Sequence, residues 1–203
     1  MSHHAPLKQQ LKTLKLSGIV ETLELRLLEA QQNQLSYSEL LASLLCDEIE
    51  TRNMRKLQRL LSQAGISSQQ TIESFDFSFN PSINAAHLRE LATCRFIERG
   101  EGIFFIGPTG TGKTHLAKAL CHQACRRYCS CAYYPFHQFF NELNKADLKN
   151  QLSKFIKNMI KVDLLVIDDF GFKKIDQPSA EFLYAIVDAR YGVKSIILTS
   201  NRA

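Results

Sequence analysis

The eight residues Gly107–Thr114 constrain the fold more than any other part of the 203-residue chain. They match the pattern G-x-x-x-x-G-K-[ST], in which glycines let the backbone wrap closely around an anion and point several N–H groups at it. An apolar stretch, Ile103–Ile106, precedes this loop, and an alanine- and leucine-rich stretch, Leu116–Ala124, follows it. This order predicts a strand, a phosphate-binding loop and a helix whose positive dipole end faces the anion.

Two side chains of the loop have distinct expected roles. Lys113 is expected to bring its charge to the β- and γ-phosphates of a nucleoside triphosphate, and Thr114 to place its hydroxyl on Mg²⁺. The predicted nucleotide-binding residues are Gly107, Pro108, Thr109, Gly110, Thr111, Gly112, Lys113 and Thr114.

Two later segments are expected to complete the site. Leu164–Ile167 has the pattern of a buried strand, and Asp168 and Asp169 follow at its carboxyl end, where parallel sheets bind ligands. We predict that Asp168 holds Mg²⁺ through water and that Asp169 orients or activates the attacking water; the alternative is a solvent-facing turn. Asn201 follows the predicted strand Ser195–Ser200 and is a candidate contact for the γ-phosphate or the water, the alternative being a plain turn residue. The predicted catalytic residues are Lys113, Asp168, Asp169 and Asn201, and the predicted Mg²⁺ ligands are Thr114 and Asp168.

Short apolar stretches alternate with helical ones from residue 103 onward, which predicts a buried parallel sheet with flanking helices. The predicted strands are Ile103–Ile106, Cys131–Tyr134, Leu164–Ile167 and Ile196–Leu198. Residues 69–203 are therefore expected to form an α/β core of the P-loop class. Residues 83–99, which precede the first strand, have a helical pattern.

The first 68 residues have only helical patterns. Apolar residues recur there at spacings of three and four, as in amphipathic helices. Ser36 and Glu39 form a candidate capping box, and Gly65 is a candidate stop for the helix that follows. The sequence predicts about three helices in a small all-α module, residues 1–68, and we expect this module to bind DNA or a partner.

Between the two parts, aromatic residues alternate with polar ones at Phe75, Phe77 and Phe79, and Asn80-Pro81 ends the run. This pattern favours an extended linker lying on a surface. We expect the three rings to pack against the core; contact with a nucleotide is the alternative.

The chain has an ordinary globular composition, with 45% hydrophobic and 22% charged residues, which excludes a disordered or fibrous protein. No run of 18 apolar residues and no signal-like start are present, so a cytoplasmic protein with reduced thiols and no membrane contact is expected. Cys121, Cys125, Cys129 and Cys131, with His122, do not have the spacing of a zinc knuckle. Small thiols buried on the helix after the loop are the expected explanation.

The formal net charge of +5 resides in the second half of the chain. Two basic series could follow a DNA backbone, although a solvated helix face is the common alternative. One series is Arg52, Arg55, Lys56 and Arg59; the other is Lys145, Lys149, Lys154, Lys157 and Lys161. Neither series shows a pattern for reading base edges, so any DNA binding is expected to be non-specific.

The chain resembles the AAA+ branch that contains the IstB-like transposition helper ATPases and the DnaC-type helicase loaders. The phosphate loop alone indicates only a nucleotide-binding protein, and flanking stretches carry the resemblance to IstB. They are Leu14–Gly18, Phe75–Phe77, Leu88–Gly100, Asp188–Tyr191 and Thr199–Arg202. The resemblance implies that residues 107–114 are Walker A, that Asp168 and Asp169 are Walker B, and that Asn201 is sensor 1. Most AAA+ proteins have Glu where this chain has Asp169.

The same resemblance implies a function. It points to a helper of an insertion-element transposase that binds ATP and Mg²⁺, oligomerises on double-stranded DNA and delivers target DNA to that transposase. The expected partners are therefore DNA, the transposase and further copies of the chain. The alternatives are a DnaC-type loader that uses ATP as a switch, or a truncated remnant that does not hydrolyse ATP.

Chains of this family continue past sensor 1 with a fifth strand, an arginine finger and a sensor 2 arginine, whereas this sequence ends two residues after Asn201. Arg202 is too close to Asn201 to be either arginine, and Arg190 is considered only as a contact with a neighbouring subunit. The resemblance also implies the strand order 5-1-4-3-2, which would leave Ile103–Ile106 as an open edge. We therefore expect the 203-residue chain to be poorly soluble and to hydrolyse ATP near background, and whether it is an enzyme is left open.

Overall fold

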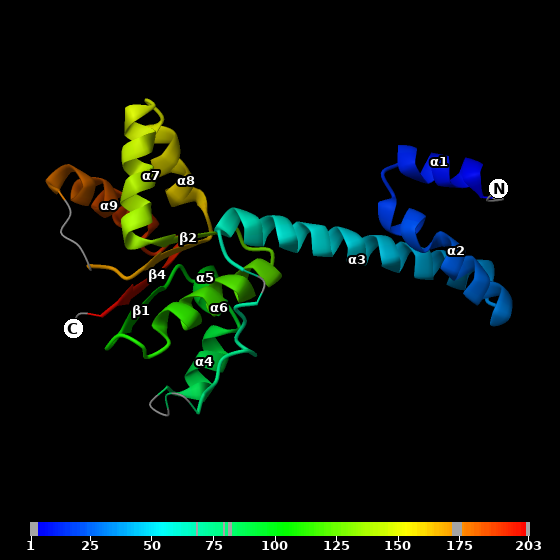
Figure 1. Ribbon diagram of the computed structural model, residues 1–203, viewed down its shortest axis with the longest axis horizontal. Coiled ribbons are helices and arrows are strands. Elements are labelled where there is room, and N and C mark those ends of the chain that lie inside the picture. Colours follow the sequence, from blue (N-terminus) through cyan, green and yellow to red (C-terminus); the bar gives the residue numbers. More distant parts are fainter. Residues whose placement is uncertain (1–3, 68, 79, 81–82, 172–175, 202–203) are drawn as a thin grey trace. The chain divides into compact units, whose positions relative to one another are not determined.

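The computed structural model describes residues 4–67, 69–78, 80, 83–171 and 176–201 (Figure 1). The chain divides into two compact units, Met1–Gln58 and Arg59–Ala203, which are described separately below. The division falls inside the third helix, ten residues before the expected boundary at 68/69.

The N-terminal unit is helical throughout its described residues. Its helices are α1 (Ala5–Thr13), α2 (Ser17–Gln32) and the first part of α3 (Tyr37–Ala64). The predicted capping box is present at the start of α3: the Ser36 N–H donates to Glu39 Oε2 at 2.8 Å, and the Glu39 N–H donates to Ser36 Oγ at 3.3 Å. At the other end of α3, Gly65 has φ +74°, the left-handed conformation of a helix stop.

Helices α2 and α3 approach closely where α2 begins. A Cβ on Gly18 would lie 2.8 Å from Glu48 Cα, so only glycine fits this position. The Glu48 carboxylate accepts the Gly18 N–H at 2.7 Å and the Ile19 N–H at 3.3 Å, and thereby caps the first turn of α2. Ile19, Leu23 and Leu44 form the small buried core beside this contact.

An ion pair joins the same two helices further along. Arg26 donates to both carboxylate oxygens of Asp47, at 2.8 and 2.6 Å, and this bidentate contact fixes its geometry. The hydrogen bonds from Arg26 lower the pKa of Asp47 to about 2.

This pair should make the N-terminal unit sensitive to acid. Because the pKa of Asp47 is lowered in the folded chain, its contribution to stability is complete above the ordinary Asp pKa of about 4 and is lost as the pH falls toward about 2. We expect Asp47→Asn to be less stable than wild type near pH 7 and to lose less stability over that acid range. Urea denaturation followed by circular dichroism at several pH values measures both effects. Equal pH dependence in the two proteins would contradict the role of Asp47.

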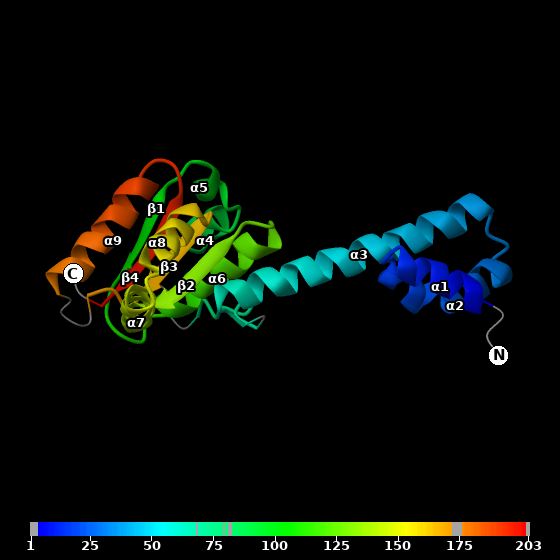
Figure 2. The ribbon, with the colours of Figure 1, turned by 90° about the horizontal axis from the view of Figure 1, so that it is seen from above.

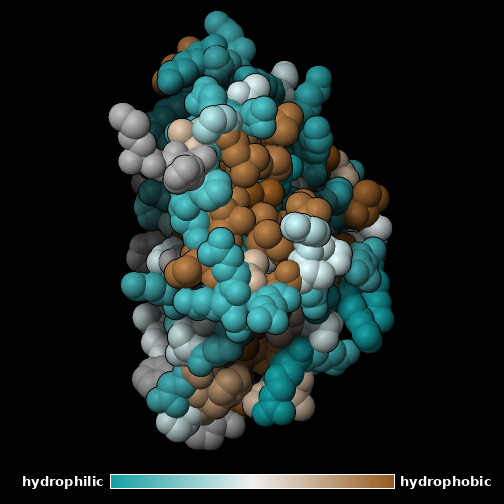
Figure 3. Space-filling view, turned by 90° about the vertical axis from the view of Figure 1, so that its right-hand side faces the viewer, coloured by the Kyte–Doolittle hydropathy of each residue, from teal (hydrophilic) through white to brown (hydrophobic). Residues whose placement is uncertain are grey.

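The N-terminal unit also exposes apolar side chains. On α3, Leu41, Leu45 and Ile49 repeat every four residues and are 60, 53 and 57% exposed. Residues four apart share one helix face, so they form an apolar stripe. Figure 3 shows a face of the molecule on which apolar side chains gather among polar ones.

The C-terminal unit is built on a four-stranded parallel sheet with the order β1-β4-β3-β2. The strands are β1 (Gly102–Ile106), β2 (Cys131–Pro135), β3 (Leu164–Asp168) and β4 (Ser195–Ser200). The predicted α/β class and the 1-4-3-2 part of the expected strand order are confirmed. Strand β3 is buried over its whole length, as its continuous apolar pattern predicts. Strand β1 lies at one end of the described sheet, where Phe104 and Ile106 are 63 and 59% exposed.

Helices cover both faces of this sheet (Figures 1 and 2). Beyond the end of α3, the helices of this unit are α4 (Ala85–Leu91), α5 (Arg95–Glu98), α6 (Lys113–Arg126), α7 (Phe136–Leu148), α8 (Leu152–Lys161) and α9 (Gln177–Arg190). Helix α6 packs against all four strands on one face, and α7, α8 and α9 build the main apolar core with the sheet on the other. Among the described residues, no helix is both long and apolar enough to cross a lipid bilayer.

Arg190, at the end of α9, is buried inside this unit and only 1% exposed. Its guanidinium donates to five backbone carbonyls: Met159 at 2.6 Å, Ile160 at 3.2 Å, Val162 at 2.9 Å, Asp163 at 3.3 Å, and Ser195. Burial lowers its pKa to about 10, so it stays charged at neutral pH. The idea that Arg190 contacts a neighbouring subunit is therefore wrong, because its side chain holds the end of α8 to the starts of β3 and β4.

Candidate nucleotide-binding site

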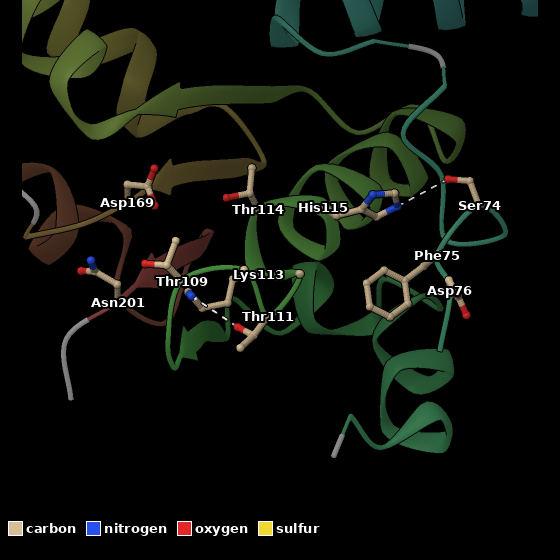
Figure 4. Close-up of a pocket in the computed structure, with 12 residues that line it drawn as sticks. Ser74, Phe75, Asp76, Thr109, Thr111, Lys113, Thr114, His115, Asp169 and Asn201 are labelled. Atoms are coloured by element: carbon tan, nitrogen blue, oxygen red, sulfur yellow. Dashed lines mark hydrogen bonds between the residues drawn. The ribbon is translucent and has the colours of Figure 1, made fainter. Parts of the chain in front are cut away.

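A cavity of about 550 Å³ lies at the carboxyl ends of the strands in the C-terminal unit. Figure 4 shows Asp169 and Asn201 on one side of this cavity, the ring of Phe75 on the other, and Lys113 between them. The cavity is lined by Ser74, Phe75, Asp76, Thr109, Gly110, Thr111, Gly112, Lys113, Thr114, His115, Asp169 and Asn201. The structure thus brings together the three predicted segments, which are far apart in the sequence.

The phosphate loop leads directly into α6. Gly110 and Gly112 have φ +82° and +92°, which side chains other than glycine rarely adopt. Helix α6 begins at Lys113, so the N–H groups of its first turn point toward the cavity that the loop lines. This is the arrangement in which a helix N-terminus binds an anion.

The Lys113 ammonium lies within the loop itself. It donates to Gly107 O at 2.8 Å and to Pro108 O at 2.6 Å, and it is 3.4 Å from Thr111 Oγ1. Gly107 and Pro108 do not line the cavity themselves. Their carbonyl oxygens accept hydrogen bonds from the ammonium group of Lys113, which does line it. The positive charge is therefore fixed beside the donors of the loop.

The two predicted Mg²⁺ ligands touch each other. Thr114 Oγ1 donates to Asp168 Oδ1 at 3.1 Å. Mg²⁺ usually keeps several of its waters, so Thr114 would bind the ion directly and Asp168 beside it would hold the ion through a bound water. A hydroxyl and a carboxylate are also the hard oxygen ligands that this ion prefers. These two residues therefore fit the ion that the sequence predicts.

Asp168 is 2% exposed and has two further partners that the sequence analysis missed. Thr199 Oγ1 donates to its Oδ1 at 2.5 Å, and Tyr133 Oη donates to its Oδ2 at 2.5 Å. Thr199 also accepts the Asp169 N–H at 2.9 Å, so one hydroxyl positions both acidic residues. Burial and the contact with Asp168 raise the pKa of Tyr133, which therefore remains a donor at neutral pH.

Both missed hydroxyls should stabilise the C-terminal unit through Asp168. We expect Tyr133→Phe to lower the free energy of unfolding by about 1.5–3 kcal/mol, because a buried carboxylate loses one charge-assisted hydrogen bond. Thr199→Val should cost more, since two hydrogen bonds disappear. Chemical denaturation checks both values, and Tyr134→Phe on the same strand is the control, because no hydrogen bond to its hydroxyl is found among the described residues. A Tyr133→Phe protein as stable as wild type would show that the hydrogen bond from Tyr133 to Asp168 does not stabilise the fold.

The linker contributes the opposite wall of the cavity. The ring of Phe75 lies 5.1 Å from Phe77 and 5.3 Å from His115, both edge-on, and is 8% exposed. A Cβ on Gly112 would be 2.9 Å from Phe75 Cε2, so this ring also covers the loop. The expected packing of the aromatic run is therefore found for Phe75 and Phe77, and Phe75 additionally faces the cavity. Phe79 and Pro81 of this run lie outside the described residues.

Asp169 and Asn201 both face the cavity from the ends of neighbouring strands (Figure 4). Asp169 has φ +57°, a left-handed conformation that Asp tolerates and that here follows directly on β3. Their roles toward water and the γ-phosphate stay predictions. Arg202, the last residue of the matching stretch, lies outside the described residues.

The two predicted basic series differ in their contacts. In the N-terminal unit, Arg52 pairs with Glu48 at 2.6 Å, and Arg55 pairs with Glu21 at 3.1 Å and also contacts Ser17. Arg55 therefore helps to hold α2 on α3, whereas the pair of Arg52 with Glu48 lies within α3. In the C-terminal unit, lysines of α7 and α8 surround a shallow hollow of about 220 Å³; the lysines are Lys145, Lys149 and Lys154.

Comparison with known proteins identifies the family. The model of the family described as IstB-like ATP binding protein matches residues 9–203. The chain belongs to this family. An ATP-binding protein of insertion sequence IS5376 from Geobacillus stearothermophilus is 38% identical over 174 residues, which are 86% of this chain and 69% of that protein. An ATP-binding protein in an insertion sequence of Mycobacterium tuberculosis is 36% identical over 97% of this chain and 79% of its own length.

Solved structures show the fold of this IstB-like chain. AMPPCP-bound DnaA from Aquifex aeolicus is 26% identical with a TM-score of 0.61, covering 67% of this chain and 43% of the DnaA chain. The DnaC helicase loader is 25% identical with a TM-score of 0.54, covering 67% of this chain and 78% of its own length. The sheet and its helices are therefore those of a P-loop AAA+ protein, as the sequence predicts. The match covers less than half of each of the two AMPPCP-bound DnaA chains.

Proposed function

We propose that this chain binds ATP with Mg²⁺ and, in the ATP-bound form, assembles with further copies on double-stranded DNA as the helper of an insertion-element transposase. The observation that carries the ATP part is the contact of Thr114 with Asp168 at 3.1 Å beside the phosphate loop. The insertion-sequence relatives and the IstB-like family support the transposition part.

The predicted site residues have separate tasks in this proposal. The N–H groups of the loop and of the first turn of α6 bind the phosphates, and Lys113 turns from the loop carbonyls to the β- and γ-oxygens. Thr114 and Asp168 hold Mg²⁺, which when bound neutralises the charge that develops on the phosphates. Asp169 accepts a hydrogen bond from the attacking water, and Asn201 donates to the γ-phosphate or orients that water.

The N-terminal unit is proposed to bind partners. Its helices expose the apolar stripe Leu41, Leu45 and Ile49, and an exposed apolar surface of this kind favours contact with another protein. We place the transposase or another copy of this chain there, within a module over residues 1–68. We place the duplex DNA on α7, α8 and the turn between them. Lys145 pairs with Glu142 within α7, and among the described residues no ion pair is found for Lys149, Lys154, Lys157 or Lys161.

DNA binding provides the test of the proposal. We expect binding to duplexes of any sequence, strengthened by Mg·ATP and weakened by salt, because only backbone contacts are available. Replacing Lys149, Lys154, Lys157 and Lys161 by alanine should reduce the slope of log K against log salt by up to about 3–4, since each phosphate contact contributes about 0.9. Fluorescence anisotropy with labelled DNA at several salt concentrations measures this slope.

A variant with Arg89→Ala and Arg99→Ala serves as the control, because these exposed residues lie near α4 and α5 rather than on α7 and α8. An unchanged slope in the lysine variant would remove α7 and α8 from the DNA interface. Absence of any ATP effect on DNA binding would contradict ATP-dependent assembly.

A helicase loader is the second candidate, because the DnaC helicase loader shares the fold at 25% identity. The two functions differ in the partner that is captured. The cognate transposase should bind in the presence of ATP under the first proposal, and a replicative helicase under the second. Pull-down with each purified partner distinguishes them.

A further inference from the structure

Three cysteines converge inside the C-terminal unit, outside the cavity described above. Cys121 and Cys125 lie one turn apart on α6, and Cys131 is the first residue of β2. Their sulfur atoms all lie within 4.8 Å of one another. Within the described part of the chain, no other three Cys, His, Asp or Glu side chains were found to converge this closely.

We propose that Cys121, Cys125 and Cys131 bind one thiophilic metal ion of the Zn²⁺ or Cu⁺ class as thiolates. This site lies outside the nucleotide cavity, and the proposed function does not depend on it. The sequence pattern alone does not show it, because two of the ligands are four residues apart on a helix and the third comes from a strand.

The distances suit such an ion. Zinc binds thiolate sulfur at about 2.3 Å, so the sulfurs of a tetrahedral site are about 3.8 Å apart. Sulfurs within 4.8 Å of one another reach this spacing by small rotations of their side chains. Cys121 and Cys125 stand on the same face of α6 because residues four apart on a helix are neighbours.

The chemistry of the three ligands determines the kind of ion. Thiolates select Zn²⁺ and Cu⁺, whereas Mg²⁺ and Ca²⁺ require oxygen ligands. All three side chains are buried, with exposed fractions of 0, 0 and 5%. A bound cation offsets the negative charge of three buried thiolates, which would be costly to bury alone.

The location gives the ion a structural consequence. Helix α6 begins at the phosphate loop, and β2 carries Tyr133, the donor to Asp168, two residues after Cys131. An ion held by both elements cross-links them beneath the nucleotide site. We therefore expect metal binding to raise the melting temperature of the chain, since a ligand that binds only the folded state stabilises it.

The test uses the full chain, reduced and freed of metal, without nucleotide. Titration with Co²⁺, a spectroscopic substitute for Zn²⁺, should give a thiolate-to-cobalt charge-transfer band that saturates near one ion per chain. A competing titration with Zn²⁺ should remove the band, and a separate titration with Cu⁺ against a Cu⁺ chelator identifies which ion binds more tightly. The ion that binds should also raise the melting temperature.

Variants assign the ligands. Cys125→Ala should lose the band and the thermal shift, whereas Cys46→Ala should retain both, because Cys46 is exposed on α3. Circular dichroism without metal shows whether Cys125→Ala is folded. If this variant does not fold, the titration of the wild-type chain still tests the proposal. Neither a thiolate–cobalt band nor a thermal shift with Zn²⁺ or Cu⁺ in the wild-type chain would overturn the proposal, and the three thiols would then be core packing alone.

Discussion

Lys113→Ala should bind Mg·ATP much more weakly than the wild-type chain does. In the structure the Lys113 ammonium lies within 2.8 Å of Gly107 O and Pro108 O, beside the N–H groups of the phosphate loop. Removing it takes away the one side-chain cation of the loop, and a charge-assisted hydrogen bond is worth about 1.5–3 kcal/mol. The dissociation constant should therefore rise by about 10- to 100-fold or more. Fluorescence anisotropy of a labelled ATP analogue measures it.

Two controls separate loss of charge from damage to the loop. Lys118→Ala removes a cation from the same helix, where Lys118 lies over the ring of Tyr133 at 5.0 Å, and it should bind nucleotide nearly as wild type does. Circular dichroism should show that Lys113→Ala remains folded. Equal affinity of wild type and Lys113→Ala would show that the nucleotide binds elsewhere. This outcome would not affect the proposals for DNA binding and for the metal ion.

Arg190→Ala should be the most destabilising single substitution in the C-terminal unit. Five backbone carbonyls at the end of α8 and the starts of β3 and β4 would lose their donor at once. Met159 and Ser195 are buried, and the other three residues are partly buried. A buried acceptor that loses its donor costs about 1–3 kcal/mol, and at least two of these carbonyls are buried. Chemical denaturation should show a loss of at least this size, with a lower yield of folded protein.

Arg99→Ala provides the matched control for that experiment. Arg99 is an exposed arginine whose side chain lies 3.5 Å from Glu101, and such surface pairs contribute at most about 1 kcal/mol. If Arg190→Ala were as stable as Arg99→Ala, the buried contacts of Arg190 would have no energetic value. A stable Arg190→Ala protein with a changed oligomeric state would instead return this residue to an intersubunit role.

The fold could be predicted because its signals are local. The loop Gly107–Thr114 sits between a strand and a helix, and the continuous apolar pattern of Leu164–Ile167 predicts a buried parallel strand. Helix signals of one or two residues, such as the Ser36 and Glu39 capping box and Gly65, also gave the correct ends of α3. Each of these depends on neighbours in the sequence.

The remainder of the site depends on which strands lie side by side. Tyr133 and Thr199 reach Asp168 only because β2 and β4 flank β3 in this register, and a hydroxyl on a strand gives no signal of that kind. Arg190 could not be placed from the sequence for a different reason. Arginine is rarely buried, so a contact at the protein surface was the natural expectation. Arg190 can be buried because five backbone carbonyls accept hydrogen bonds from its guanidinium, and no sequence pattern shows that these carbonyls converge there.

The contact of Phe75 with Gly112 has a consequence for the history of the sequence. The ring occupies the space where a Cβ would stand, and φ +92° independently disfavours any side chain at 112. Two separate restrictions, one on conformation and one on volume, therefore act on a single position. In a relative with a small residue in place of Phe75, the restriction on volume at position 112 would be relaxed, but the restriction on conformation would remain. Across descendants of this gene, position 75 should thus vary more freely than position 112, and it should change without a matching change at the glycine.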